Sequence, residues 1–503
     1  MRIALINPYV EKMHRELSYA ENFRPPLGLL YVAAVLEAAG YEVKVLDALQ
    51  QRVGDGALRD WLMRERPDVV GLGIYTPTRF ESFRTAQWVR DTLGPDVHII
   101  AGGPHPSAVP EDTLLHVPAI DHLVAGEGEY PMRDLVAALE EGRPVDGIGG
   151  VWTRKDGIPV SCGTQGNIQH VDELPFPARH LVHLRSYGTR MPSTMSRCTT
   201  MLTSRGCPAR CIFCTRDWFS RKTRMHSPEY MLEEIQRIFA DHGKQGIIFQ
   251  DDTFTLSKKR IHALCDLIRA RGLKFQWLAT TRVDCLDKEL MRSMKSAGCR
   301  VLTFGAESMN QETLDWLRKG FTVEQVRQAV QWADEIGLTV RCTYLIGIGN
   351  ETEQDLVHSI AEARKLKVSK LKANVGLSLY PGTPVWPMAI EQGILTPDYS
   401  YAAGWQDPEK RYGNGETPRW YTPHVPLARI MELRKQTEVN AFFTRLSPRM
   451  VQHRALKVCR RLAKHPIETA KHVAQAARLS VFDTNLHRKA RKLDADLETA
   501  EPH

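Results

Sequence analysis

The stretch Thr199–Thr215, T-T-M-L-T-S-R-G-C-P-A-R-C-I-F-C-T, organises the whole chain. It places Cys207, Cys211 and Cys214 in C-x3-C-x2-C spacing behind a short apolar, β-prone run. A loop with three thiols after a strand can hold an iron–sulfur cluster by three corners, which leaves the fourth iron open to a non-protein ligand. The alternatives are three core cysteines or a zinc site that lacks one ligand.

This loop resembles the cluster loop of the radical S-adenosylmethionine (SAM) superfamily, C-x3-C-x-aromatic-C, with Phe213 in the aromatic position. The resemblance implies a [4Fe-4S] cluster bound by the three cysteines. It also implies that the open iron chelates the amino and carboxylate groups of SAM. One electron from the cluster then cleaves SAM to methionine and a 5′-deoxyadenosyl radical.

Composition sets the broad class of the protein. The 503 residues are 43% hydrophobic and 25% charged, as in ordinary globular proteins, and the length predicts about three domains. No apolar run approaches the roughly 20 residues that span a bilayer. The ten cysteines show no pairing pattern, which favours a reducing cytoplasm. The net charge of +8 is concentrated near the C-terminal end.

Residues 1–142 alternate short apolar strands with amphipathic helices, which predicts a doubly wound, Rossmann-like α/β domain with a parallel sheet. Such sheets bind ligands beyond the carboxyl ends of their strands. Three expected strands end in turns there, at residues 75–78, 102–105 and 126–129. Glycines in the last two turns allow a bulky flat ligand to approach the backbone.

This domain resembles the cobalamin-binding domain that precedes the radical SAM core in a large class of enzymes. The resemblance rests on P-P-L-G-L-L-Y-V-A-A-V-L-E (residues 25–37), the G-G-P-H turn and the G-E-G-E turn. The D-x-H-x-x-G signature is absent, so the resemblance implies cobalamin bound without a protein imidazole. It implies contacts from Tyr75, Thr76, Gly103, His105 and Glu127. One alternative is that the domain keeps this fold but binds no corrinoid. Another is that His105 is an ordinary hydrogen-bonding histidine of a turn.

The remaining chain is predicted as three parts. Residues 143–194 form a linker with a hairpin that turns at Lys155-Asp156-Gly157. Residues 195–385 form the radical SAM core, a partial (β/α)6 TIM-type barrel whose chemistry gathers at the C-terminal strand ends. The expected strands cover residues 201–204, 246–250, 275–279, 301–304, 340–346 and 373–379.

The same resemblance assigns SAM contacts to the barrel strand ends. Asp251 and Asp252, in Q-D-D-T, would supply an anion to the SAM ammonium, with helix capping as the alternative for either one singly. Arg282 would meet the SAM carboxylate or pair with Asp284. The family's G-x-E-S element is matched by G-A-E-S and its glycine-rich adenine element by L-I-G-I-G-N-E-T. The predicted SAM set is therefore Phe213, Asp251, Glu307, Ser308 and Gly347.

Residues 386–503 are predicted as a C-terminal extension. The aromatic stretch Gly404–Tyr421 would either cap the barrel or anchor a surface loop, and Leu427–Leu446 would be helical. Between Arg445 and Lys492 there are thirteen Lys/Arg and two acidic residues. That composition is compatible with basic amphipathic helices on an anionic membrane face. A solvated face is the favoured single alternative, and nucleic-acid binding is disfavoured.

Together these features predict a cytoplasmic enzyme, peripheral at the membrane if the basic helices bind lipid. In the resembling class the radical abstracts a substrate hydrogen, and a methyl group carried by cobalamin reaches an unactivated carbon or phosphorus of a small-molecule or lipid substrate. Flavodoxin or ferredoxin would supply the electron. The alternatives are a radical cyclase, ring-modifying or carbon–carbon-forming enzyme, and a non-catalytic corrinoid-binding protein. A methylthiotransferase is disfavoured because no cysteine precedes Cys162.

Overall fold

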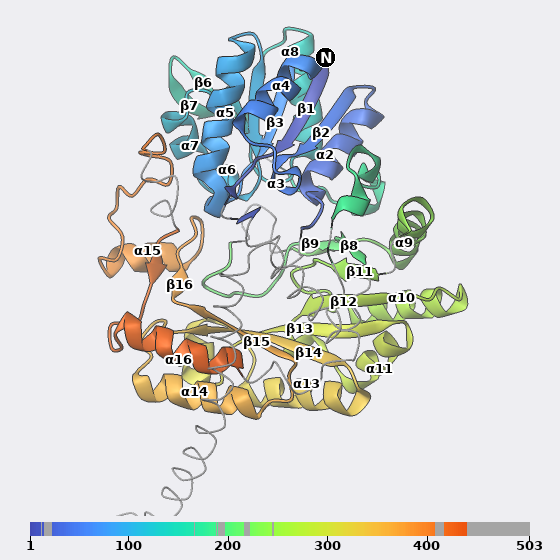
Figure 1. The fold of residues 1–503 in the computed structure, drawn as a ribbon, viewed down its shortest axis with the longest axis vertical. Helices are drawn as coiled ribbons and strands as arrows, with labels where there is room; N and C mark the ends of the chain where they lie inside the picture. Colours follow the sequence, from blue (N-terminus) through green and yellow to red (C-terminus); the bar gives the residue numbers. More distant parts are fainter. Residues whose placement is uncertain are drawn as a thin grey trace, which may run out of the picture.

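The computed structural model describes residues 1–439 apart from residues 12, 15–22, 165, 188, 190–196, 216–221, 244–245 and 408–416. The described residues form two large sheets, one of seven strands and one of six. Figure 1 shows the N-terminal sheet stacked above the second sheet, with helices around both.

The N-terminal sheet begins with five parallel strands in the order β2-β1-β3-β4-β5. Along β1, Ile3 and Leu5 join the core under one face, while Ala4 and Ile6 join the core under the other. Successive side chains of a strand point to opposite faces, and both sets are apolar here, as a sheet covered by helices on both faces requires. The predicted doubly wound domain is confirmed, with strands β1 (Arg2–Asn7), β2 (Glu42–Asp47), β3 (Val69–Gly73), β4 (His98–Gly102) and β5 (His122–Val124).

Helices cover the two faces of this sheet in pairs. One pair comprises α2 (Leu27–Ala38) and α8 (Glu129–Glu140), which contact each other, and the other comprises α4 (Asp55–Glu65) and α5 (Arg79–Leu93). Shorter helices follow the strand ends, namely α3 (Ala48–Gln51), α6 (Pro104–Ala108) and α7 (Pro110–His116).

The hairpin predicted in the linker extends the N-terminal sheet. Its strands, β6 (Val151–Lys155) and β7 (Ile158–Ser161), are antiparallel, and β6 pairs with β5. The turn residues Asp156 and Gly157 both have positive φ, 52° and 80°. Two left-handed residues are what a two-residue hairpin turn requires, which explains the Asp-Gly pair.

The second sheet is the predicted partial barrel. Its six strands run parallel in the order β15-β14-β13-β12-β11-β8, each joined to the next through a helix on the outside. The first strand ends at Met201, earlier than predicted, because Ser204 and Arg205 pair with Arg224 and Met225 instead. The strands are β8 (Cys198–Met201), β11 (Gly246–Phe249), β12 (Gln276–Thr281), β13 (Cys299–Glu307), β14 (Thr339–Ile346) and β15 (Lys370–Val375).

Amphipathic helices enclose this sheet and bury its apolar core, to which Phe249, Trp277 and Phe304 contribute. Most of these helices start at a capping Ser, Thr, Asp or Asn whose side chain accepts a backbone N–H, as at Ser227 and Thr322. The helices are α9 (Pro228–His242), α10 (Lys258–Ala270), α11 (Lys288–Ser296), α12 (Gln311–Trp316), α13 (Val323–Ile336) and α14 (Glu353–Lys365). Short strand pairs join β9 (Ser204–Arg205) to β10 (Arg224–Met225) and β16 (Leu377–Ser378) to β17 (Arg419–Trp420).

Beyond α15 (Val385–Glu391) the chain returns to the N-terminal domain. Ala402 and Trp405 belong to the core under α5, and the Trp405 indole donates to the His116 carbonyl at 2.8 Å. Arg79 Nε donates to the Tyr401 carbonyl at 2.7 Å. Of the two roles predicted for the aromatic stretch, Trp405 and Trp420 fit that of anchoring a surface loop. Residues 408–416 of this stretch lie outside the described residues.

The last described helix, α16 (Leu427–Val439), packs against β15 and α14. Ile430 of α16 is fully buried and lies against Gly347 at the end of β14. The prediction of a helix from Leu427 to Leu446 thus holds as far as Val439, and the basic stretch from Arg445 to Lys492 lies outside the described residues.

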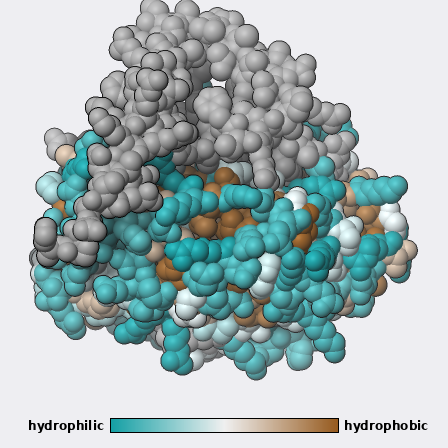
Figure 2. All heavy atoms as spheres, turned by 90° about the horizontal axis from the view of Figure 1, so that it is seen from below, coloured by the Kyte–Doolittle hydropathy of each residue, from teal (hydrophilic) through white to brown (hydrophobic). Residues whose placement is uncertain are grey.

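The described surface is mainly polar. Figure 2 shows hydrophilic side chains over most of the described face seen from below, with smaller apolar areas between them. Among the described residues, no helix combines the length and hydropathy that crossing a bilayer requires.

We expect Ile430→Ala to lower the free energy of unfolding by about 2–5 kcal/mol, because it removes a fully buried side chain at the α16 contact. Chemical denaturation followed by circular dichroism measures the change. The control is Met431→Ala on the same helix, where the side chain is 39% exposed and the expected change is within about 0.5 kcal/mol. Equal effects of the two variants would contradict the packing of α16.

Candidate functional site

A cavity of about 330 Å³ lies at the carboxyl ends of the strands in the N-terminal sheet. Its walls are largely apolar, with Leu29, Ile74 and Met132 among them. The opposite wall comes from the second domain, through residues 202 and 204–206 and through Asp252. The ligand position expected for a parallel sheet therefore coincides with the start of the cysteine loop.

Glycines shape the N-terminal wall of this cavity. Gly103 has φ +102°, and an added Cβ would lie 2.8 Å from the Ile74 carbonyl oxygen, so the turn after β4 requires glycine. Gly28 also lines the cavity, and an added Cβ there would meet no atom within 4 Å. The wall is therefore bare backbone at a position where a flat, bulky ligand has room.

The structure divides the residues predicted to contact the corrinoid. Tyr75, Gly103 and Glu127 line the cavity, and the Tyr75 side chain is 52% exposed. Thr76 and His105 do not line it. Their side chains are buried against each other, with His105 Nδ1 3.3 Å from Thr76 Oγ1.

His105 is therefore the hydrogen-bonding histidine of the alternative interpretation. The helix α6 starts directly after Gly103 and turns the imidazole toward Phe83 and Tyr401. Burial, reinforced by the nearby Arg79 charge, lowers the pKa of His105 well below its ordinary value. His105 and Thr76 thus lie outside the cavity lining, and their contact with a corrinoid stays a prediction.

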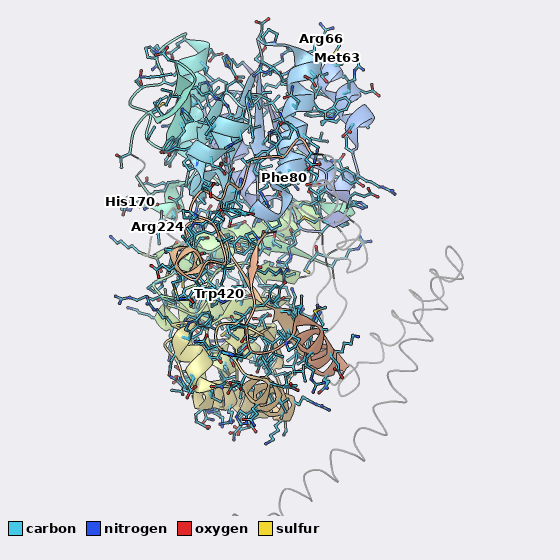
Figure 3. All side chains as sticks on the ribbon, turned by 90° about the vertical axis from the view of Figure 1, so that its left-hand side faces the viewer. Met63, Arg66, Phe80, His170, Arg224 and Trp420 are labelled. Carbon is cyan, nitrogen blue, oxygen red and sulfur yellow. The ribbon has the colours of Figure 1, made fainter. Side chains whose placement is uncertain are left out.

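A buried ionic network joins the two walls of the cavity. Arg205 Nη2 lies 2.6 Å from Glu129 Oε1, and Arg205 Nη1 lies 3.4 Å from Glu127 Oε1. Arg224 Nη1 contacts the other Glu127 oxygen at 2.6 Å. Each of these side chains is at most 6% exposed. Arg224 lies at the junction of the two domains (Figure 3).

The carboxylates of the network keep the Arg205 guanidinium charged. Burial alone would lower the pKa of Arg205, but the carboxylates of Glu129 and Glu127 raise it above its ordinary value. The guanidinium also lies 5.3 Å from the ring of Tyr31, a cavity residue. Since Arg205 precedes Cys207 by two residues, the network positions the cysteine loop relative to the cavity.

The three cysteines of the loop lie in a mostly buried environment. Cys207 and Cys211 are 7% and 6% exposed, and Cys214 is half-buried. Thr253 Oγ1 lies 3.6 Å from Cys207 Sγ, and Arg282 Nη1 lies 3.9 Å from Cys211 Sγ. Hydrogen-bond donors next to sulfur are the expected surroundings of thiolates that bind iron.

Among the described residues, no three cysteine, histidine or carboxylate side chains converge on a single metal-ion site. Zinc ligands share one ion, whereas the thiolates of an iron–sulfur cubane each bind a separate iron.

The two adjacent aspartates after β11 have different surroundings. Asp251 Oδ1 accepts hydrogen bonds from the Thr203 amide, the Thr203 hydroxyl and the Ser204 hydroxyl at 2.5–3.0 Å. Its carboxylate therefore anchors the chain before the cysteine loop, whereas Asp252 lines the cavity. Of the two aspartates predicted to face the SAM ammonium, Asp252 lines the cavity and Asp251 does not.

Glu307 lies at the end of β13 as predicted, in a left-handed conformation with φ +64°. Lys319 Nζ is 3.3 Å from Glu307 Oε1 and 5.6 Å from the Phe213 ring centroid. Burial raises the pKa of Glu307, and Lys319 opposes that rise. Lys319 is buried beside the cysteine loop, and the sequence analysis missed it because a lone lysine after a short helix carries no motif.

Two further predicted SAM residues have structural roles. Ser308 is fully buried and its hydroxyl lies 3.2 Å from Ser359 Oγ of α14, away from the barrel mouth. Gly347 has φ +70°, and an added Cβ would lie 2.7 Å from Ile430, so its close contact is with α16. Neither position shows the free surface that a SAM contact needs.

Glu351, which follows the glycine-rich turn after β14, holds that turn in place. Its carboxylate accepts hydrogen bonds from the Ile348 amide at 3.0 Å and the Thr313 hydroxyl at 3.1 Å. Burial raises its pKa to about 7, although these hydrogen bonds oppose the rise.

A ligand cavity at the end of a parallel sheet, facing a cysteine loop on a partial barrel, defines a two-domain α/β protein built for a large ligand and a metal cluster. Family models identify both parts: residues 17–136 match the B12 binding domain, and residues 201–363 match the Radical SAM superfamily. The chain belongs to the radical SAM superfamily and carries a B12-binding domain before the radical SAM domain. It is accordingly an enzyme whose cofactors are a [4Fe-4S] cluster, SAM and cobalamin.

Relatives agree with this assignment. The uncharacterized methyltransferase PH0819 of Pyrococcus horikoshii is 32% identical over 78% of this chain and 84% of its own length. The anaerobic magnesium-protoporphyrin IX monomethyl ester cyclase of Rubrivivax gelatinosus is 30% identical over 72% of this chain and 66% of its own. The fold is that of the radical SAM methyltransferase TsrM from Kitasatospora setae, solved with cobalamin and a [4Fe-4S] cluster, at a TM-score of 0.70 and 19% identity over 87% of this chain and 91% of that one.

We expect Arg205→Met to destabilise the protein by about 3–5 kcal/mol, because it leaves the buried Glu129 carboxylate without its partner. The double variant Arg205→Met/Glu129→Leu removes both charges and should recover most of that loss. Denaturant midpoints of the variants measure both effects. The control is Arg237→Met, which breaks an exposed pair with Glu233 and should cost at most about 1 kcal/mol. A double variant as unstable as the single one would contradict a buried charge pair.

The raised pKa of Glu351 makes a pH-dependent contribution to stability. The folded protein binds the proton more tightly than the unfolded chain, so the contribution is complete below about pH 4.5 and is lost as pH rises through about 7. We expect Glu351→Gln to reduce the loss of stability between pH 5 and pH 8, measured by thermal unfolding. Glu353→Gln, a change at an exposed residue of α14, is the matched control. An unchanged pH profile in Glu351→Gln would refute this assignment.

Proposed function

We propose that this protein is a cobalamin-dependent radical SAM methyltransferase that acts on an unactivated carbon or phosphorus of a small-molecule or lipid substrate. One observation carries the proposal: a single cavity has the B12-binding turns on one wall and the residues just before Cys207 on the other. A methyl carrier in that cavity would therefore lie next to the radical source.

The proposed roles of the residues follow from their positions. Cys207, Cys211 and Cys214 hold the cluster. Phe213 and Glu307, with Lys319 between them, form the SAM side, and Asp252 faces the cavity from the same domain. When bound, the cluster and SAM supply a carbon-centred radical, and cobalamin supplies a transferable methyl group.

On the corrinoid side, Tyr75, Gly103 and Glu127 form part of the wall. The mostly apolar lining leaves little favourable binding for water, which limits side reactions of reactive intermediates. Delivery of the electron by flavodoxin or ferredoxin, a cytoplasmic location and membrane contact through the basic stretch at 445–492 remain predictions from the sequence.

A second candidate is a radical cyclase or another carbon–carbon-forming enzyme of the same architecture. The Rubrivivax gelatinosus relative, named as a cyclase, favours it, since its identity to this chain is close to that of the methyltransferase relative. The two candidates share the cluster and the cavity. They differ in whether the SAM methyl group enters the product.

The test uses the full chain, reconstituted anaerobically with iron, sulfide and hydroxocobalamin, then given a strong reductant and SAM with a deuterated methyl group. We expect bound iron, release of 5′-deoxyadenosine, and transfer of the labelled methyl group to the cobalamin fraction, each followed by mass spectrometry or visible spectra. The Cys207→Ala/Cys211→Ala/Cys214→Ala variant should lose iron and release no 5′-deoxyadenosine above background.

The control is Cys162→Ala, a cysteine of the N-terminal domain core, which should retain both properties. Iron content and turnover that survive the triple replacement would end the enzyme proposal. Formation of 5′-deoxyadenosine without label on cobalamin would instead favour the cyclase candidate.

A further inference from the structure

Arg282, directly after β12, has a guanidinium that is fixed from several sides. Its Nε and Nη2 lie 2.9 and 2.8 Å from the two Asp284 carboxylate oxygens, a bidentate pair. Nη2 also donates to the Lys319 carbonyl, and the guanidinium carbon lies 5.2 Å from the Phe321 ring centroid. The side chain is 13% exposed, so these contacts leave it little freedom.

The third nitrogen, Nη1, has a different partner. It donates to Cys211 Sγ at 3.9 Å, within the longer range of hydrogen bonds to sulfur. Asp284 binds the Nε and Nη2 side of the guanidinium, which leaves Nη1 as the nitrogen that faces the cysteine loop. The geometry therefore directs a permanent positive charge toward this particular thiol.

The alternative predicted for Arg282, a bidentate pair with the SAM carboxylate, conflicts with these contacts. A carboxylate of SAM would have to displace Asp284 from the guanidinium edge that it already occupies. Lys319, whose ammonium pairs with Glu307 and lies near the Phe213 ring, is the nearby cation on the Phe213 side of the loop. The structure thus separates Arg282 from SAM binding.

We propose that Arg282 is a positioning residue that donates a charge-assisted hydrogen bond to the Cys211 thiolate and raises the reduction potential of the cluster. This proposal rests on the proposed function, specifically on Cys211 as an iron ligand. Reduction adds one negative charge to the cluster, and a fixed cation beside a ligating sulfur stabilises the reduced form. Asp284 holds the cation at the position where it has this effect.

The test measures the midpoint potential of the cluster in the reconstituted full chain without SAM, by redox titration followed by electron paramagnetic resonance. We expect Arg282→Gln to shift the midpoint potential to a more negative value. Arg282→Lys keeps the positive charge but loses the planar guanidinium, so it should give a smaller shift in the same direction. Arg269→Gln on α10, where the guanidinium contacts Asp266 and serine oxygens at the surface, is the matched control and should match the unmodified protein.

Arg282→Met provides a second route, because it removes the positive charge and all the hydrogen-bond donors together. We expect a negative shift at least as large as that of Arg282→Gln, with iron content retained. A potential equal to that of the unmodified protein in an iron-replete Arg282→Gln or Arg282→Met would overturn the proposal. Failure of the unmodified protein to assemble any cluster would instead remove the proposed function, so the two failures are distinct.

Discussion

The contact on which the site depends is the buried pairing of Arg205 with Glu129 and Glu127 across the two domains. Charges this deep are tolerated when each has a partner at hydrogen-bond distance, and here the partners come from opposite walls of the cavity. The pairing therefore favours one relative placement of the walls over others. The cysteine loop begins two residues after Arg205, so the same contact relates the metal-binding thiols to the cavity.

Asp251 and Arg260 continue this arrangement into the barrel. Asp251 binds the backbone and side chains of residues 203 and 204, and Arg260 Nη1 donates to the Thr203 carbonyl at 2.8 Å. The segment before the cysteines is therefore held by the N-terminal domain on one side and by two barrel elements on the other. A loop that must present three thiols in a fixed geometry gains from support on both sides.

Much of this molecule could be predicted from the sequence, because periodicity and turn residues report local structure. The order of strands, both sheets and the position of the cysteine loop follow from them. The direction of single side chains does not. Asp251 and Asp252 are adjacent, yet Asp251 binds residues 203 and 204 while Asp252 alone of the two lines the cavity. The surroundings of His105 and Gly347 were equally hidden in the sequence, since Tyr401 and Ile430, distant in sequence, lie against them.

The return of the chain to α5 has a consequence for biosynthesis. Ala402 and Trp405 are part of the core that Phe83 and Ile99 begin, about 300 residues earlier. A nascent chain that has left the ribosome only as far as the first domain lacks these side chains, so the apolar pocket under α5 stays open to water until the barrel has been translated. Completion of the first domain is thereby made contingent on synthesis of the second, and a chain truncated between them would expose a surface that chaperones recognise.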